Sequence, residues 1–123
     1  MADELDVLLV EDDEAVRTSF AEILREARYS VAEAADSQAA LDILNSSRVR
    51  TVVLDVYLPT RSGLWLLDQL EKPPSVVLVT GHPYDPEVMQ RRDKVFLYLQ
   101  KPIHPPELLV AVARAVARQA GDE

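Results

Sequence analysis

Short runs of apolar residues, separated by segments with helical spacing, constrain the fold of this chain more than any other feature. The runs at 7–10, 51–54 and 76–79 are apolar at almost every position, which is typical of strands buried on both faces. Weaker runs at 29–34 and 95–99 bring the number of predicted strands to five. Because helical segments alternate with these strands, the pattern predicts a parallel sheet covered by helices on both faces.

The helical segments that follow the strands carry ordinary start signals. Predicted helices span about 14–28, 64–70 and 85–92, and the last helix begins at Pro105. The remaining helix is expected to begin after an N-cap at Ser37. No repeat, linker or low-complexity tract interrupts this alternation, so the sequence indicates no second domain.

Composition excludes several classes of protein. The formal net charge of -8 argues against a nucleic-acid-binding surface, which would need clustered lysine and arginine. The absence of cysteine excludes disulfides, thiolate chemistry and zinc–sulfur sites. The chain has no apolar run of about 18 residues and begins with acidic residues, so we expect neither a membrane span nor a secretory signal. We therefore expect one cytoplasmic domain over residues 1–123, with its core at about 5–120.

Polar side chains follow four of the predicted strands at the point where each strand ends. They are Glu11, Asp12 and Asp13 after the first strand, Asp55 after the third, Thr80 after the fourth and Lys101 after the fifth. Each of them alone reads most simply as a helix cap, a turn residue or a solvated charge. Because the carboxyl ends of parallel strands meet at one edge of a sheet, their convergence predicts a functional site.

A cluster of carboxylates requires a cation, because the negative charges repel one another. Oxygen ligands without cysteine or paired histidine favour a hard ion, and an open edge with few protein ligands suits hydrated Mg²⁺. A metal beside Lys101 and Thr80 forms a receptor for a dianionic phosphoryl group. Since a carboxylate can act as the nucleophile towards phosphorus, we predict that Asp55 accepts a phosphoryl group.

Four segments of the chain, in order and at matching separations, resemble the receiver domain of bacterial two-component response regulators. They are Val10-Glu11-Asp12-Asp13, Val53-Leu54-Asp55-Val56-Tyr57-Leu58-Pro59 with the following Gly63, Val79-Thr80, and Lys101-Pro102-Ile103. The resemblance extends over almost the whole chain. It implies a flavodoxin-like (βα)5 fold of the α/β class, a doubly wound five-stranded parallel sheet with strand order 2-1-3-4-5.

The resemblance also implies a metal site around the acceptor. Asp55 would be the phosphoacceptor, Asp12 a direct Mg²⁺ ligand, and Glu11 a ligand that acts through water. The main-chain carbonyl of Tyr57 would be a further ligand. We expect Asp13 to cap the first helix instead of binding the metal.

The remaining matches concern what happens after phosphorylation. Thr80 and Lys101 would contact the phosphoryl group once it is on the chain. Tyr98 lies at the position of the family's aromatic switch residue, although it reads equally well as an ordinary half-buried strand aromatic. The peptide bond before Pro102 is often cis in this family.

The function implied is that of a switch, not of an enzyme with a separate substrate. A sensor histidine kinase or a phosphotransfer protein would phosphorylate Asp55, and the chain would promote its own phosphotransfer and dephosphorylation. The phosphate would shift the surface made by the fourth helix, the fifth strand and the fifth helix. That surface would contact an output domain or a second copy, with no direct binding of nucleic acid and no membrane partner.

Departures from the family pattern lie near the fourth helix, in the surface that would report phosphorylation, and they leave the acceptor site intact. Gly81 follows the threonine where alanine is usual, and 82–86 is rich in proline, so we expect a short fourth helix. Two alternatives remain open. One is a receiver fold that binds partners without phosphorylation. The other is a phosphatase of the haloacid dehalogenase kind, which needs a second aspartate where Tyr57 stands.

Overall fold

The apolar runs form the strands of a parallel sheet in the computed structural model, which describes residues 3–121. The strands are β1 (Asp3–Val10), β2 (Val31–Ala34), β3 (Ser47–Asp55), β4 (Ser75–Thr80) and β5 (Leu97–Gln100). They lie in the order β2-β1-β3-β4-β5, and every neighbouring pair is parallel. The predicted flavodoxin-like strand order is therefore confirmed.

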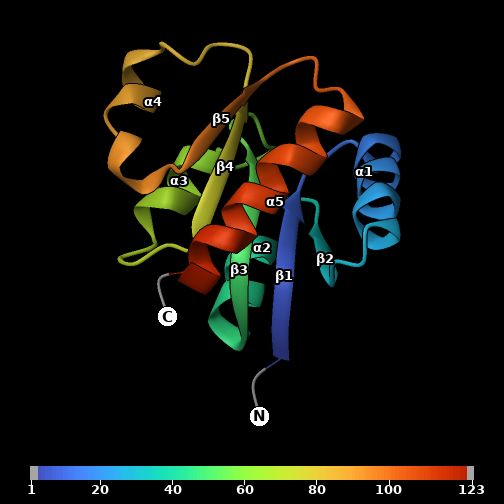
Figure 1. Cartoon of the computed structure of the whole chain (residues 1–123). Coiled ribbons are helices and arrows are strands. Elements are labelled where there is room, and N and C mark those ends of the chain that lie inside the picture. Colours follow the sequence, from blue (N-terminus) through green and yellow to red (C-terminus); the bar gives the residue numbers. More distant parts are fainter. Residues whose placement is uncertain (1–2, 122–123) are drawn as a thin grey trace.

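Helices cover both faces of this sheet (Figure 1). They are α1 (Glu14–Glu26), α2 (Ser37–Ser46), α3 (Gly63–Asp68), α4 (Pro86–Met89), the 3-10 turn η1 (Arg92–Lys94) and α5 (Pro105–Gly121). The helices α1 and α5 pack on one face, and α2 and α3 pack on the other. None of the helices in this part of the chain combines the length and the apolar character needed to span a bilayer.

Alternate side chains of the central strands supply two apolar cores, one on each face. In β1, Leu8 and Val10 face the α2 and α3 layer, whereas Val7 and Leu9 face α1 and α5. All four are at most 1% exposed. Burying such a side chain stabilises the fold by about 1.5–3 kcal/mol, which explains why the runs lack polar alternation.

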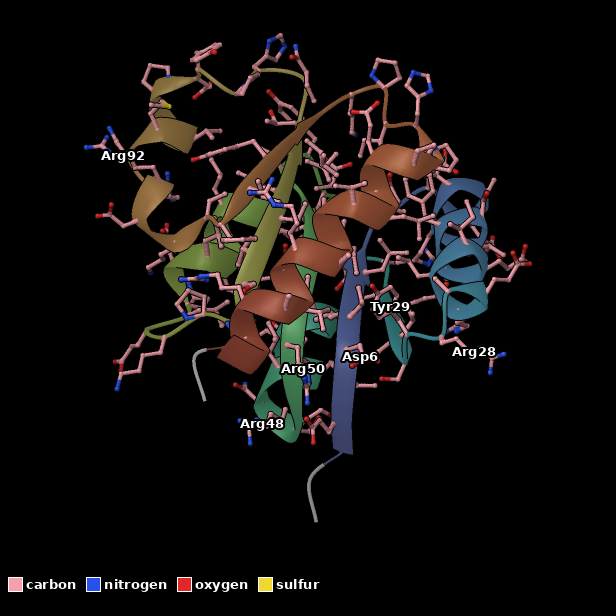
Figure 2. The ribbon with its side chains drawn as sticks, viewed as in Figure 1. Asp6, Arg28, Tyr29, Arg48, Arg50 and Arg92 are labelled. Atoms are coloured by element: carbon pink, nitrogen blue, oxygen red, sulfur yellow. The ribbon has the colours of Figure 1, made fainter. Side chains whose placement is uncertain are left out.

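Both β1 and β3 begin before the apolar runs that predicted them. Their first residues pair in register, with Asp3 opposite Ser47, and Arg50 Nη2 lies 2.8 Å from Glu4 Oε1. Arg50 also lies near Asp6, on the neighbouring strand (Figure 2). Polar residues that pair with one another extend these strands, and a search for apolar residues does not detect them.

Asp36, and not Ser37, is the N-cap of α2. The Oδ1 of Asp36 accepts a hydrogen bond from Ala39 N at 2.8 Å, so the predicted cap is wrong by one residue. Ser37 is instead buried, and its hydroxyl donates to the carbonyls of Arg61 and Ser62. The predicted cap of α1 is confirmed, because Asp13 Oδ1 accepts from Val16 N at 3.1 Å.

The fourth helix is short, as predicted from the sequence, and side chains of the segment that follows it bind to α3. Arg91 makes two contacts of 2.8 Å with the Asp68 carboxylate, and Lys94 Nζ donates to the Leu67 carbonyl at 2.9 Å. Arg92 instead points away from the molecule (Figure 2). Arg91 is therefore paired with α3, although an arginine at this place in the sequence resembles a solvated surface charge.

Candidate functional site

The structure brings together the polar side chains that follow β1, β3 and β5. One carboxylate oxygen each from Glu11, Asp12 and Asp55 lies within 4.8 Å of the others. Lys101 Nζ lies 2.6 Å from Asp55 Oδ2. These four residues come from three separate segments of the chain, and the parallel sheet places them at one edge.

Asp55 is a buried carboxylate with a partner on each oxygen. Its exposed fraction is 3%, because it ends β3 in the middle of the sheet. The main-chain N–H of Tyr57 donates to Oδ1 at 2.9 Å, and Lys101 donates to Oδ2. These two donors offset the cost of burying the charge and fix the direction of the carboxylate.

The loop after Asp55 folds back against the strand end. Gly63 N donates to Val56 O at 2.8 Å, and Thr60 adopts a positive φ of 67°. On the outer side of the loop, the Arg61 guanidinium lies 4.2 Å from the centre of the Trp65 ring. The loop is therefore anchored on both sides of its turn, beside the carboxylate cluster.

Glu11 and Asp12 occupy the start of the loop between β1 and α1. Burial raises the pKa of Glu11, as do Asp12 and the charge of Asp55, while a hydrogen bond from Asp13 N and the charge of Lys101 oppose the rise. Burial is the largest of these causes, and the neighbouring carboxylates add to it. By formal charge, three carboxylates face the single ammonium of Lys101, so the cluster carries an excess of negative charge. Asp13 stays outside the cluster and caps α1.

The donor set of the cluster fits Mg²⁺. It consists of carboxylate oxygens at an open edge, with Asp12 exposed, Glu11 half-buried and Asp55 buried. A hard cation with several water ligands suits such a site, and it would relieve the excess of negative charge. The backbone at Tyr57, the fourth predicted ligand, is held beside Asp55 by its hydrogen bond to that carboxylate.

Lys101 remains cationic beside this cluster. Burial lowers the pKa of Lys101, but the hydrogen bond to Asp55 and the charges of Asp55, Glu11 and Asp12 outweigh it, so the pKa is raised. The Lys101–Pro102 peptide bond is cis, which agrees with the expectation. Lys101 N also donates to Thr80 O at 3.2 Å, so β4 helps to position the ammonium.

Thr80 and Tyr98 lie on neighbouring strands, and both hydroxyls have internal positions. Thr80 is 1% exposed, and its Oγ1 accepts from His82 N at 2.9 Å. The Tyr98 hydroxyl is buried without a hydrogen-bond partner among the described residues, and burial raises the pKa of Tyr98. Tyr98 is thus half-buried on its strand with an internal hydroxyl, which is compatible with either reading of it.

Two features of the site were not predicted from the sequence. Arg17 Nη1 donates to the main-chain carbonyl of Glu11 at 2.9 Å, although an arginine on α1 reads as a surface charge. A cavity of about 530 Å³ also opens beside Asp55 and Lys101, between apolar side chains that include Phe20 and Ile103. Neither feature has a signal in hydrophobic spacing or in a short motif.

Comparison with known proteins gives a consistent result. The family profile described as the response regulator receiver domain matches residues 7–113. The transcriptional regulatory protein PdtaR of Mycobacterium tuberculosis is 32% identical over 116 residues, which cover 91% of this chain and 57% of the relative. The response regulator MprA of Mycolicibacterium vanbaalenii is 35% identical over 121 residues, covering 95% and 52% respectively. The chain thus spans about half the length of these two relatives.

A solved structure extends the comparison to the fold. The CheY-like receiver domain protein of Methanospirillum hungatei JF-1 superposes with a TM-score of 0.86 over 100% of both chains. Its sequence is 24% identical to this one, so the superposition bears on the fold alone.

Proposed function

This chain belongs to the response regulator receiver domain family of two-component systems, and on that premise we propose that Asp55 accepts a phosphoryl group from a signalling partner. The observation that supports this most directly is the setting of Asp55. It is a buried carboxylate, paired with an ammonium, at a sheet edge that also holds two further carboxylates. A purely structural ion pair has no need of the additional acidic groups.

In the proposed transfer, a carboxylate oxygen of Asp55 forms a bond to phosphorus and gives an acyl phosphate. The phosphorus–nitrogen bond of the donor's phosphohistidine breaks, and the leaving imidazole takes up a proton from water. The donor is a sensor histidine kinase or a phosphotransfer protein of the cytoplasm. Hydrolysis later releases inorganic phosphate and restores the carboxylate, and the chain promotes both steps on itself.

The residues around Asp55 bind and orient the phosphoryl group. Lys101 lies 2.6 Å from the acceptor carboxylate and supplies one positive charge for the phosphoryl oxygens. Glu11, Asp12, Asp55 and the Tyr57 carbonyl would hold Mg²⁺, which supplies further positive charge to the same oxygens when bound. The Thr80 hydroxyl is the neutral donor of the set, because its oxygen accepts from His82 N and its own proton remains available for a phosphoryl oxygen.

The response to phosphorylation rests on Thr80 and Tyr98. Movement of the Thr80 hydroxyl towards the phosphate removes a bond that now holds the loop between β4 and α4. We infer that the phosphate favours one arrangement of α4, β5 and α5, since its contacts form in that arrangement. An output domain or a second copy of the chain would read this surface.

The test is the mass of the intact protein after incubation with Mg²⁺ and acetyl phosphate. We expect the wild type to gain one phosphoryl group, Asp55→Asn to gain none, and the matched control Asp13→Asn to be modified like the wild type. Asp13 is a nearby aspartate whose role is to cap α1, and asparagine preserves a cap. An unmodified wild type, under conditions that modify another receiver, would contradict the proposal and favour a receiver fold that binds partners without phosphorylation.

A further inference from the structure

Arg17 connects α1 to the segment that carries the proposed metal ligands. Its side chain is 17% exposed, and Nη1 donates to the Glu11 carbonyl at 2.9 Å. Glu11 N in turn donates to the carbonyl of Ala34 in β2 at 3.1 Å. The main chain of Glu11 is therefore held through both its carbonyl and its N–H, just before Asp12.

Glu33 orients Arg17 from the edge strand. Glu33 Oε1 lies 3.5 Å from Arg17 Nε, and Glu33 Oε2 lies 3.0 Å from Arg25 Nη1. Arg25 in turn donates to the Val31 carbonyl at 2.9 Å. Two arginines of α1 thus share one carboxylate of β2, but Arg17 is the one that reaches the Glu11 carbonyl.

The Glu11–Asp12 segment needs the support of Arg17, because repulsion between carboxylates opposes the close arrangement that binds a cation. Glu11, Asp12 and Asp55 repel one another, because one carboxylate oxygen of each lies within 4.8 Å of the others. Without external anchors, the loop would relax so that its carboxylates separate. A metal ion would then bind only the minor population in which the carboxylates lie close together. The apparent affinity for the metal would be lower as a result.

We propose that Arg17, oriented by Glu33, is a positioning residue that holds the Glu11–Asp12 segment in its metal-binding geometry. The inference deepens the proposed function, on which it rests. Arg17 also carries a positive charge, which acts against a cation nearby. The Glu33 carboxylate, which Arg17 shares with Arg25, offsets part of that charge. In the proposal the geometric effect prevails, so loss of Arg17 weakens metal binding.

The experiment measures the affinity for Mg²⁺ by calorimetry in the absence of any phosphodonor. We expect Arg17→Met to weaken Mg²⁺ binding by about tenfold or more, as for other groups that orient metal ligands. The matched control Arg25→Met loses a contact with the same Glu33 carboxylate but none with Glu11, and its affinity should stay within about twofold of the wild type. Urea unfolding of both variants separates an effect on metal binding from an effect on folding.

Phosphorylation by acetyl phosphate provides a second readout. Arg17→Met should need a higher Mg²⁺ concentration for half-maximal rate, while the rate at saturating Mg²⁺ approaches that of the wild type. Arg17→Lys keeps the charge but lacks the second nitrogen that lets arginine contact Glu33 and Glu11 together, so it should bind Mg²⁺ with intermediate affinity. It also serves as the test variant if Arg17→Met does not fold.

Three outcomes would overturn the proposal. If Arg17→Met and Arg17→Lys bind Mg²⁺ as tightly as the wild type, the contact of Arg17 with the Glu11 carbonyl is merely structural. Equal weakening in Arg25→Met would assign the effect to the helix as a whole. A wild type that neither binds Mg²⁺ nor accepts phosphate would refute the proposed function, and the inference with it, whereas the first two outcomes leave that function intact.

Discussion

Gly63 lies directly against the main-chain carbonyl of Asp55. A Cβ on residue 63 would overlap the carbonyl oxygen, and it would lie 3.1 Å both from the carbonyl carbon and from Leu54 Cγ. Backbone and a buried leucine cannot move aside as a flexible surface side chain would. The absence of a side chain at Gly63 is what lets the loop return onto the strand end that carries the proposed nucleophile.

Gly63→Ala should therefore both destabilise the fold and disturb the site. We expect a loss of about 1–3 kcal/mol in the free energy of unfolding, the usual cost of inserting a methyl group into a packed region. The variant should also be phosphorylated more slowly, because Asp55 must shift. Urea unfolding and the rate of mass gain with acetyl phosphate measure the two effects.

Gly81→Ala is the matched control for stability. Apart from its own chain neighbours, a Cβ on Gly81 meets no atom of the described residues within 4 Å. Its φ is not positive, so alanine fits without strain. We expect the free energy of unfolding to stay the same or to rise by about 0.4–1 kcal/mol through the unfolded state. Equal destabilisation of both variants would contradict the role given to Gly63.

Tyr98→Phe should stabilise the unphosphorylated protein. The Tyr98 hydroxyl is buried without a partner in the described part of the chain, so its removal relieves an uncompensated loss of hydration. We expect a gain of up to about 1 kcal/mol in the free energy of unfolding, set by the cost of an unsatisfied hydroxyl. Tyr84→Phe, at a side chain that is 86% exposed, should change nothing. Destabilisation of Tyr98→Phe would show that the hydroxyl has a partner in solution.

Hydrophobic spacing and the geometry of parallel sheets were sufficient to predict a parallel sheet covered on both faces and the convergence at Asp55, whereas the strand order was implied by the resemblance to receiver domains. Runs of valine and leucine mark strands buried on both faces, and the ends of such strands meet at one edge. The convergence of Asp12 and Lys101 on Asp55 follows from that rule without any knowledge of their distances. The chemical roles of these residues remain predictions, which the mass measurement tests.

The contacts that fix the site were harder to predict, because they depend on pairs that are distant in the sequence. Arg17 looks like an ordinary surface charge until β2 places Glu33 beside it. Arg91 likewise resembles a surface charge in the sequence, and only the fold places Asp68 of α3 beside it. A pattern of apolar residues reports which side chains are buried, but it carries no information about which partner a charged side chain will meet.

The Arg91–Asp68 pair should make stability depend on pH. The hydrogen bond from Arg91 lowers the pKa of Asp68 below its ordinary value of 3.8. A carboxyl group whose pKa is lowered in the folded state stabilises the fold at pH values above its pKa in the unfolded state. This stabilisation is lost as the pH falls through its pKa in the folded state. Asp68→Asn should thus cost about 0.5–1 kcal/mol near neutral pH, discounted for exposure, and less at about pH 3.

Urea unfolding at both pH values checks this prediction, with Arg91→Gln as the matched background. In that background the partner of Asp68 is gone, so Asp68→Asn should have little effect at either pH. A cost that is unchanged between neutral and acidic pH would assign the effect of Asp68 to something other than its charge.

Tyr57 should lengthen the lifetime of the acyl phosphate. Its main-chain N–H is bonded to Asp55, so its side chain begins next to the acceptor and can hinder the approach of water. The ring is 58% exposed, which limits the shielding. We expect Tyr57→Ala to shorten the half-life about two- to fivefold, a change in activation free energy of less than about 1 kcal/mol.

Tyr84→Ala removes an aromatic ring that is even more exposed, and it should leave the half-life unchanged. The measurement is the decay of phosphorylated protein by intact mass after the donor is removed, and equal half-lives for Tyr57→Ala and the wild type would exclude shielding.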